Sequence, residues 1–512
     1  MDYSSVKGMH DIYGHEAAGM SYISSVLKAT AELYSYSEMI PPVLEYTEVF
    51  SRGTGESSDI VRKEMYTFTD KGERSVTLRP EFTAGVVRSV VSNKLYATEE
   101  MPLKLYYCGP AFRYERPQLG RYRQFNQFGV EAIGQDSARL DAECIIMAVQ
   151  GLSMLGFEKL SLKINTIGDD ETRAAYREAL KSYFALHIDT MCEDCHERLK
   201  LNPMRILDCK VEADQKIAQG APKIKDYLSK ESEKRFYETL SIINDLGIDY
   251  EIDDSLVRGL DYYSEVVFEI HALAKDGTDY GALCGGGHYG GLVKELGGPD
   301  LPGVGFAMGL ERVYGLMEKD GLLANLETGI DIYVMPVGEN VLNDVFVLTE
   351  EVRQLGYSAD TPLSALKMGA MFKKAERRGA KFALILGEDE LAKGIAQLKN
   401  LKTKEQSEIS LKNLGEELDA AFEKAFPNAA DDDGCGHHDE DEPADGCLDQ
   451  AQEKKDDCRC GKSHGGDGCG CQNEKKDESG CGYADGSTSD EESECATPEK
   501  NQPEEKKKGE GK

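Results

Sequence analysis

The chain lacks both an excess of basic residues and a long apolar run. Its 512 residues include 60 Lys and Arg against 93 Asp and Glu, which gives a formal net charge of -33. A charge of this size argues against a protein that coats nucleic acid or binds membrane surfaces through its overall field. It does not exclude a local basic segment that contacts nucleic acid.

No stretch approaches the roughly 20 consecutive apolar residues that cross a bilayer. Residues 1–14 are polar and lack the apolar segment of a signal peptide. We therefore expect a cytoplasmic protein without a membrane partner. In such a compartment the 14 cysteines are expected to be free, metal-bound or redox-sensing rather than paired in disulfides.

Aliphatic residues become scarce beyond Pro427, where Asp, Glu, Gly, Cys and Lys dominate. A segment of this composition buries too little apolar surface to offset its chain entropy, so we expect 427–512 to be a disordered acidic tail. The preceding residues have the apolar periodicity of packed domains, and the length indicates more than one domain.

The tail is also rich in soft metal ligands. Cys-x-Cys pairs and adjacent histidines predict a dynamic zinc- or copper-binding segment, whereas the alternatives are an acidic solubilising extension or a metal buffer attached to an enzyme. The residues concerned are Cys435, Cys447, Cys458, Cys460, Cys469, Cys471, Cys481, Cys495, His437, His438 and His464.

The segment 112–131 concentrates four arginines within eleven positions of this acidic chain. Pro117 and Gly120 indicate a loop, and the alternation after it predicts a strand with Gln127 and Glu131 on one face. The other face, with Phe128, Val130 and Ala132, is expected to be buried. A strand, an arginine-bearing loop and a strand form a hairpin that can hold polyphosphate with guanidinium forks. The alternative is a salt-bridged surface hairpin.

Elsewhere the periodicity predicts alternating helices and strands. We expect helices at 16–38, 139–157, 340–355 and 367–378, mostly helical structure over 169–250, and strands at 64–69, 75–79, 159–165, 332–336 and 382–386. A basic cluster at 373–381 is either a solvated helix face or a nucleic-acid contact.

Several separate motifs occur in the order typical of class II aminoacyl-tRNA synthetases, and together they resemble the bacterial histidyl-tRNA synthetase family over residues 1–426. They are VKGMHD at 6–11, PVLE at 42–45, RPEFTA at 79–84, the hairpin at 112–131, RGLDYY at 258–263, LCGGGHYGGL at 283–292 and GLER at 309–312.

The resemblance implies an α+β catalytic domain over 1–325, in which helices flank an antiparallel sheet and 169–250 is a helical insertion. An α/β anticodon-binding domain over 329–426 and the disordered tail would follow. It also implies a homodimer, which condenses L-histidine with ATP to histidyl-adenylate and transfers histidine to the 3′ end of tRNA(His).

The family's functional residues map onto this chain by motif. The resemblance implies catalytic roles for Arg113, Arg258 and Arg312, ATP contacts from Arg113, Arg121 and Arg312, and Mg²⁺ as the polyphosphate counter-ion. A histidine pocket must pair both ring nitrogens, and Glu131 and Tyr263 can do so. The implied histidine-binding residues are Glu81, Phe82, Thr83, Arg113, Gln127, Glu131, Arg258, Tyr262 and Tyr263.

Four positions depart from the family pattern. Phe82 stands where many relatives have glycine, which should only narrow the turn. His288 and Gly290 stand where Arg and Asp are usual, and we assign His288 no catalytic role. Leu119 often has a basic counterpart, which leaves the tRNA contact of that part of the loop open.

A second group of cysteines lies in the helical segment. Cys192 and Cys195 form a Cys-x-x-Cys pair that Cys209 or His196 can complete as a zinc site. The alternative is three unligated thiols.

A related non-enzymatic protein gives the alternative function, a histidine-binding regulatory subunit of ATP phosphoribosyltransferase. That paralogue generally lacks the anticodon-binding domain and the ATP-contacting residues. Residues 331–425 are present here, and so are the implied ATP-contacting and catalytic arginines, so we expect the ligase. These are Arg113, Arg121, Arg258 and Arg312.

Overall fold

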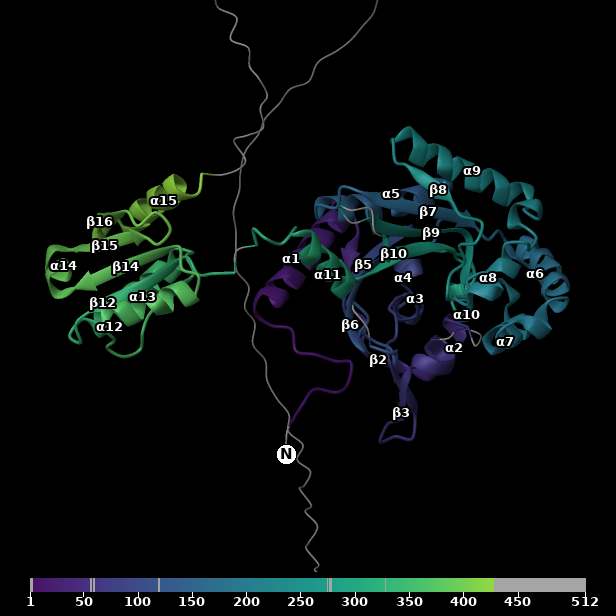
Figure 1. Cartoon of the computed structure of the whole chain (residues 1–512), viewed down its shortest axis with the longest axis horizontal. Helices are drawn as coiled ribbons and strands as arrows, with labels where there is room; N and C mark the ends of the chain where they lie inside the picture. Colours follow the sequence, from purple (N-terminus) through teal and green to yellow (C-terminus); the bar gives the residue numbers. More distant parts are fainter. Residues whose placement is uncertain are drawn as a thin grey trace, which may run out of the picture. The chain divides into compact units, whose positions relative to one another are not determined.

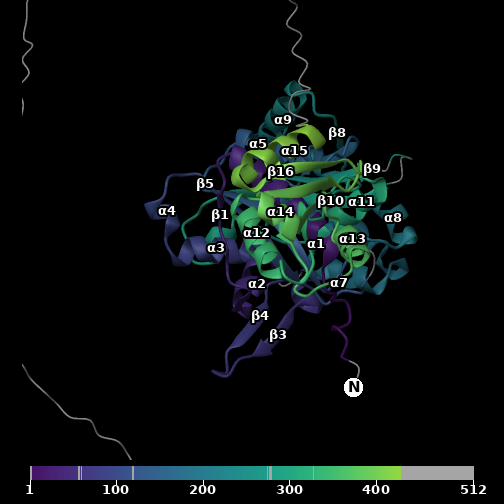
Figure 2. The ribbon, with the colours of Figure 1, turned by 90° about the vertical axis from the view of Figure 1, so that its left-hand side faces the viewer.

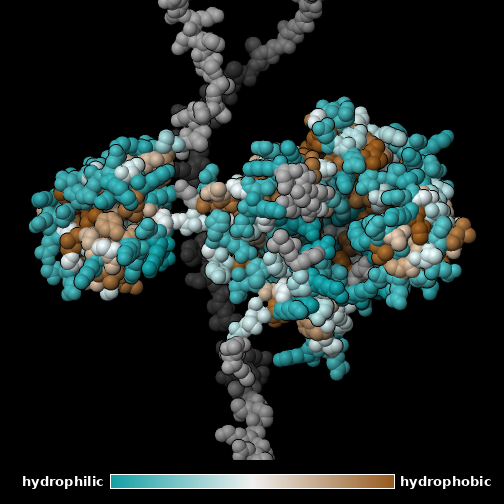
Figure 3. Space-filling model, in the orientation of Figure 1, coloured by the Kyte–Doolittle hydropathy of each residue, from teal (hydrophilic) through white to brown (hydrophobic). Residues whose placement is uncertain are grey.

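The computed structural model describes residues 3–55, 58, 60–117, 120–273, 275, 279–326 and 328–427 (Figure 1). The predicted tail after Pro427 lies outside the described residues. Leu119, in the loop of the hairpin, also lies outside them. Within the described part, no helix combines the length and apolarity needed to cross a bilayer. The face seen in Figure 3 is covered mainly by hydrophilic residues.

An eight-stranded sheet forms the centre of the N-terminal part. Its strands run in the order β1 (Ser37–Glu38), β5 (Leu103–Phe112), β6 (Gln124–Ile133), β11 (Gly303–Gly309), β10 (Asp279–Tyr289), β9 (Tyr263–Leu273), β7 (Leu160–Thr166) and β8 (Tyr250–Ile252). The expected antiparallel sheet needs one correction, because β1 pairs in parallel with β5, as does β8 with β7. The sheet is therefore mixed, and its inner pairs are antiparallel.

The two faces of this sheet carry separate cores. One core includes Phe128, Val130 and Ala132 of β6, the face that the alternation predicted to be buried. It is covered by α1 (Gly14–Leu33), α5 (Ala138–Met154), α9 (Lys230–Asp245) and α11 (Leu310–Asp320) (Figure 1). The opposite face packs on α3 (Thr83–Ser92), α10 (Leu292–Glu295) and the helices between residues 170 and 218.

Two of the helices between β7 and β8 start at polar N-caps, whose side chains accept hydrogen bonds from the free amides of the first helical turn. Asp169 accepts from Thr172 N at 2.8 Å to begin α6 (Asp170–Ala185), and Ser229 accepts from Ser232 N at 3.1 Å to begin α9. Between them lie α7 (Glu193–Leu201) and α8 (Glu212–Ala218). The helical expectation for this stretch is met, and only the short β8 at its end is extended.

A small antiparallel sheet lies beside the second core. It has the order β2 (Leu44–Tyr46), β4 (Ser75–Leu78), β3 (Tyr66–Thr69), in agreement with the strands predicted at 64–69 and 75–79. Two short helices, α2 (Thr47–Gly53) and α4 (Leu95–Thr98), and a π-helical turn at Ile60–Glu64 complete this region. The helix predicted at 16–38 ends at Leu33, because Ser37 and Glu38 pair with β5 instead.

Residues 332–425 form a five-stranded α/β unit (Figure 2). Its strand order is β13 (Ala359–Asp360), β12 (Ile332–Val337), β14 (Phe382–Gly387), β15 (Ile395–Asn400), β16 (Gln406–Ser410). One face packs on α12 (Leu342–Gln354) and α15 (Leu414–Ala425), and the other on α13 (Met368–Arg377). The short α14 (Glu388–Lys393) joins β14 to β15. The predicted strands and helices of this unit are confirmed.

Candidate active site

A cavity of about 440 Å³ opens on the α3 side of the eight-stranded sheet. Ten of the residues predicted for the site line it together, although they are spread over more than 200 positions of the chain. They are Glu81, Thr83, Arg113, Arg121, Gln127, Glu131, Arg258, Tyr262, Tyr263 and Arg312. The hairpin of β5 and β6 supplies the middle of this set, as the strand–loop–strand prediction required.

Glu131 is the most buried acid of the cavity, with an exposed fraction of 1%. Its Oε1 accepts hydrogen bonds from Thr83 Oγ1 at 2.7 Å and Tyr107 OH at 3.2 Å, and its Oε2 accepts from Tyr289 OH at 2.8 Å. Gly305 faces it on β11, where a Cβ atom would lie 2.2 Å from Glu131 Oε2. Glycine is therefore required here for the carboxylate to fit.

Burial raises the pKa of Glu131 to about 8, against hydrogen bonds that favour the ionised form and with help from the nearby Glu81. A carboxyl group in this state is poised to ionise when a cation or a strong donor enters. An imidazole ring with its N–H groups is such a ligand.

The turn before α3 places a second carboxylate beside the first. Glu81 accepts from the backbone amides of Thr83 at 2.6 Å and Ala84 at 3.0 Å, so it caps the first turn of the helix. Burial raises the pKa of Glu81, and these amides act in the opposite sense. Two acidic groups, Glu81 and Glu131, therefore line the cavity.

Gln127 offers an unsatisfied acceptor next to these acids. Its side chain is 8% exposed, and its Oε1 has no hydrogen-bond partner among the described residues. This oxygen is free to accept a hydrogen bond from a molecule that enters the cavity.

Phe82 takes a different place from the one predicted. Its ring stacks on Tyr107 at 4.4 Å with an interplanar angle of 4°, and it is absent from the residues that line the described cavity. It supports Tyr107 from behind instead of facing the space that a ligand would fill.

Arginines line the same cavity. Arg113 donates from Nε to Pro80 O at 2.8 Å and lies over the ring of Phe125. Arg258 forms an ion pair with Glu269, and its buried Nε has no hydrogen-bond partner among the described residues. A Cβ on Gly285 would lie 2.3 Å from Arg258 Nη2, so glycine is needed at this position of β10 for the guanidinium to reach the cavity.

Arg121 and Arg312 lie near a second cavity of about 810 Å³, which shares several lining residues with the first. Burial, together with the neighbouring Arg121 guanidinium, lowers the pKa of Arg312. Two neighbouring guanidinium groups favour an anionic ligand between them.

Four residues of the site were missed by the sequence reasoning. Tyr107 and Tyr289 donate to Glu131, Glu269 pairs with Arg258, and the Glu311 carboxylate accepts from Asn126 N at 2.7 Å. The last contact ties the start of α11 to β6. Tyr289 and Glu311 stood inside recognised motifs, whereas Tyr107 and Glu269 lie in strands without a local signal.

His288 points away from the cavity, into the core beside α5. Its Nδ1 lies 3.2 Å from Asp141 Oδ1 and 3.0 Å from Arg235 Nη2, and Arg235 Nε donates to Asp141 Oδ2 at 2.7 Å. It does not line the described cavities. Of the predicted zinc ligands, Cys209 lines the larger cavity, and Cys192 and Cys195 line neither.

Comparison with known proteins places these motifs in one family. The family model described as histidyl-tRNA synthetase matches residues 8–313, and that described as anticodon binding domain matches 331–421. The chain is 47% identical over 414 residues to the histidine–tRNA ligase of Geobacillus sp. (strain WCH70), covering 81% of this chain and 98% of the relative. It is 45% identical over 411 residues to that of Bacillus subtilis (strain 168), covering 80% and 97%.

Solved structures agree with this assignment. The apo histidyl-tRNA synthetase of S. aureus superposes with a TM-score of 0.70 at 37% identity, over 81% of this chain and all of that one. A histidyl-tRNA synthetase from Nostoc sp. PCC 7120, at 19% identity and a TM-score of 0.61, covers 82% of this chain and all of its own, and it shows the fold alone. The chain therefore belongs to the histidyl-tRNA synthetase family.

Proposed function

We propose that this chain is a histidine–tRNA ligase, which activates L-histidine with ATP and transfers the histidyl group to the 3′ end of tRNA(His). The observation that carries the proposal is the combination of residues that line one cavity. Buried acceptors at Glu131, Glu81 and Gln127 line it together with Arg113, Arg258 and Arg312. Acceptors suit the amino and ring N–H groups of histidine, and arginines suit the phosphates of ATP.

The buried acceptors of the cavity hold the amino acid. Glu131 accepts from one ring N–H, and the hydroxyl of Tyr263 engages the other nitrogen. Glu81, Thr83 and the free Gln127 Oε1 receive the α-ammonium group. A side chain that cannot pair with these buried groups leaves them unsatisfied, and this supplies selectivity without an editing site.

The arginines of the cavity bind the phosphates. The histidine carboxylate attacks the α-phosphate in line, and pyrophosphate leaves, so catalysis is mainly positioning and stabilisation of negative charge. Arg113 and Arg258 neutralise the α-phosphate, and Arg258 also orients the substrate carboxylate. Arg312 and Arg121 receive the outer phosphates. ATP enters as its Mg²⁺ complex, in which the ion screens the polyphosphate charge.

The five-stranded unit at residues 331–421 is the anticodon-binding part. Its helix α13 and the following turn present exposed Lys373, Lys374, Arg377 and Arg378, which suits contact with tRNA phosphates. Arg378 also pairs with Asp360 at 3.1 Å.

We also propose a cytoplasmic homodimer with the domain limits expected from the sequence. The β2 region offers an apolar surface for a second copy, since Val43, Leu44 and Tyr46 are 38%, 45% and 52% exposed. Sedimentation of the purified protein tests the dimer.

Charging of tRNA(His) with labelled histidine tests the proposal, together with ATP–pyrophosphate exchange. Arg258→Ala is expected to lower exchange by about 100-fold or more, as removal of a donor to a developing negative charge does. Arg139→Ala is the matched control, because the Arg139 side chain is 80% exposed on α5. Exchange that is unchanged in Arg258→Ala would overturn the assigned role. Histidine binding without tRNA charging would instead support the regulatory-subunit alternative.

A further inference from the structure

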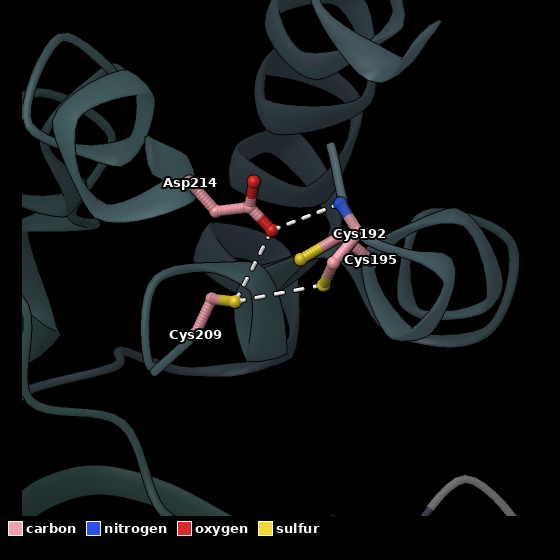
Figure 4. Close-up of side chains that lie close together, drawn as sticks. All are labelled: Cys192, Cys195, Cys209 and Asp214. Atoms are coloured by element: carbon pink, nitrogen blue, oxygen red, sulfur yellow. Dashed lines mark hydrogen bonds between the residues drawn. The ribbon is translucent and has the colours of Figure 1, made fainter. Parts of the chain in front are cut away.

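Four potential metal ligands converge between α7 and α8 (Figure 4). Cys192, Cys195, Cys209 and Asp214 each offer one ligand atom, and these four atoms all lie within 4.8 Å of one another. Cys195, Cys209 and Asp214 are buried, and Cys192 is half-buried. His196, the alternative ligand expected from the sequence, is not part of this group.

The distances between these atoms suit a tetrahedral ion. With zinc–sulfur bonds of about 2.3 Å, two sulfur ligands of a tetrahedron lie about 3.8 Å apart. Cys192 Sγ and Cys209 Sγ are separated by 3.8 Å, and Cys209 Sγ lies 3.3 Å from Asp214 Oδ2. A disulfide would require sulfurs about 2 Å apart and would leave the third thiol and the carboxylate unused.

The buried carboxylate is the second sign of a cation. Asp214 is 1% exposed, and no ion pair is formed by it within the described ranges. Its Oδ2 accepts from Cys192 N at 3.1 Å. A carboxylate at such a depth is normally paired with a positive charge or bound to a metal.

The thiols are chemically consistent with this role. Val211 N points at Cys209 Sγ from 3.5 Å, a donor that would stabilise a thiolate. Cys192 stands at the N-cap of α7, where the helix dipole also favours negative charge.

We propose that Cys192, Cys195, Cys209 and Asp214 bind one Zn²⁺ in a closed structural site. Three thiols release three protons, and their thiolates and the Asp214 carboxylate fill the four positions of the ion. Three soft sulfur ligands in a tetrahedron favour zinc over Mg²⁺ or Ca²⁺. No position remains for water, so the ion holds structure and takes no part in catalysis.

The site would fix the segment that leads toward the catalytic cavity. Between Cys195 and Cys209, Asn202 Nδ2 donates to Asp261 Oδ1 at 2.9 Å, and Arg205 Nη1 donates to Gly259 O at 3.0 Å. Both acceptors belong to the segment that carries Arg258. A zinc ion that joins α7 to α8 therefore positions this segment indirectly, although the metal site does not depend on the proposed function.

The test uses the full-length chain with the eight cysteines after residue 428 replaced by serine, so that the tail cannot contribute thiolates. This protein is loaded with Zn²⁺, passed over a weak chelating resin and analysed for metal. We expect about one retained zinc per chain, which Cys195→Ser and Asp214→Asn lose. Cys108→Ser is the matched control, since Cys108 is a half-buried thiol outside the group, and it should keep the ion.

Cobalt substitution supplies a readout that does not depend on the variants. Co²⁺ in the parent protein should show tetrahedral bands and thiolate charge-transfer absorption, and Zn²⁺ should displace it. If Cys195→Ser fails to fold, Asp214→Asn and the cobalt spectrum decide the matter. A parent protein that retains no zinc, or zinc that survives both substitutions, would overturn the proposal.

Discussion

Replacing Glu131 by glutamine should change stability and substrate binding in opposite directions. The carboxyl is 1% exposed, and burial raises its pKa from 4.5 to about 8. That rise corresponds to about 5 kcal/mol of unfavourable ionisation in the empty folded protein. Glutamine keeps the shape of the side chain and cannot ionise.

The sign follows from proton binding. Between pH 4.5 and about 8 the folded protein holds this proton and the unfolded chain has lost it, so wild-type stability falls as the pH rises. The loss is about 1.4 kcal/mol per pH unit, or about 3 kcal/mol between pH 5.5 and pH 7.5. Glu131→Gln should lack this part of the pH dependence. Its stability relative to wild type should therefore increase by that amount over the interval.

Urea unfolding of the ligand-free protein measures the effect. The chain has no tryptophan, so far-UV circular dichroism is the suitable probe. Histidine binding should move the other way, because a charge-assisted hydrogen bond of about 1.5–3 kcal/mol is lost, which raises the KM for histidine roughly 10- to 100-fold. Parallel pH curves for the two proteins, or an unchanged KM, would refute the reasoning.

Asp141→Asn is the matched control. This carboxyl is equally buried, but it accepts from Arg235 Nε at 2.7 Å and lies outside the cavity. Removing one partner of a buried pair should destabilise the protein by about 3–5 kcal/mol near neutral pH. The KM for histidine should stay unchanged in the surviving folded fraction.

Three further substitutions test other parts of the site. Gly305→Ala places a Cβ 2.2 Å from Glu131 Oε2, and we expect loss of histidine-dependent pyrophosphate exchange with about 1–3 kcal/mol of destabilisation in urea unfolding. Arg312→Ala should raise the KM for ATP by about tenfold or more, while the KM for histidine changes little, because we propose that its guanidinium binds the ATP phosphates. Glu311→Gln should lower the thermal midpoint by weakening the contacts to Asn126, and a midpoint equal to wild type would contradict that role.

The hairpin at 112–131 shows what local pattern can predict. Alternation after Gly120 gave the correct buried face of β6, because residues two apart in a strand lie on the same side. The mixed character of the sheet could not be predicted in the same way. Its outer strand β1 has only two residues, too few for a repeat in the sequence to indicate a strand or the direction in which it pairs with β5.

The missed residues have a common physical cause. Tyr107 pairs with Gly129 across the β5–β6 ladder, so its ring passes over the glycine and its hydroxyl reaches Glu131, two residues further along β6. This contact depends on register, which the sequence of either strand alone does not specify. Asp214 was missed for another reason, since one acid among 93 carries no signal until the fold places it beside Cys209.

The charge of the cavity also explains how an acidic enzyme can bind two anionic substrates. Long-range attraction cannot bring ATP or tRNA to a chain with a net charge of -33, so binding must depend on local groups at short distance. Arg258 and Arg312 are held in a partly buried space, where each charge acts with less screening than on the surface. The same burial makes Glu131 costly to ionise until histidine arrives. Substrate binding thus relieves an electrostatic penalty of the empty site, and a mutation that neutralises Glu131 should stabilise the fold while it weakens the reaction.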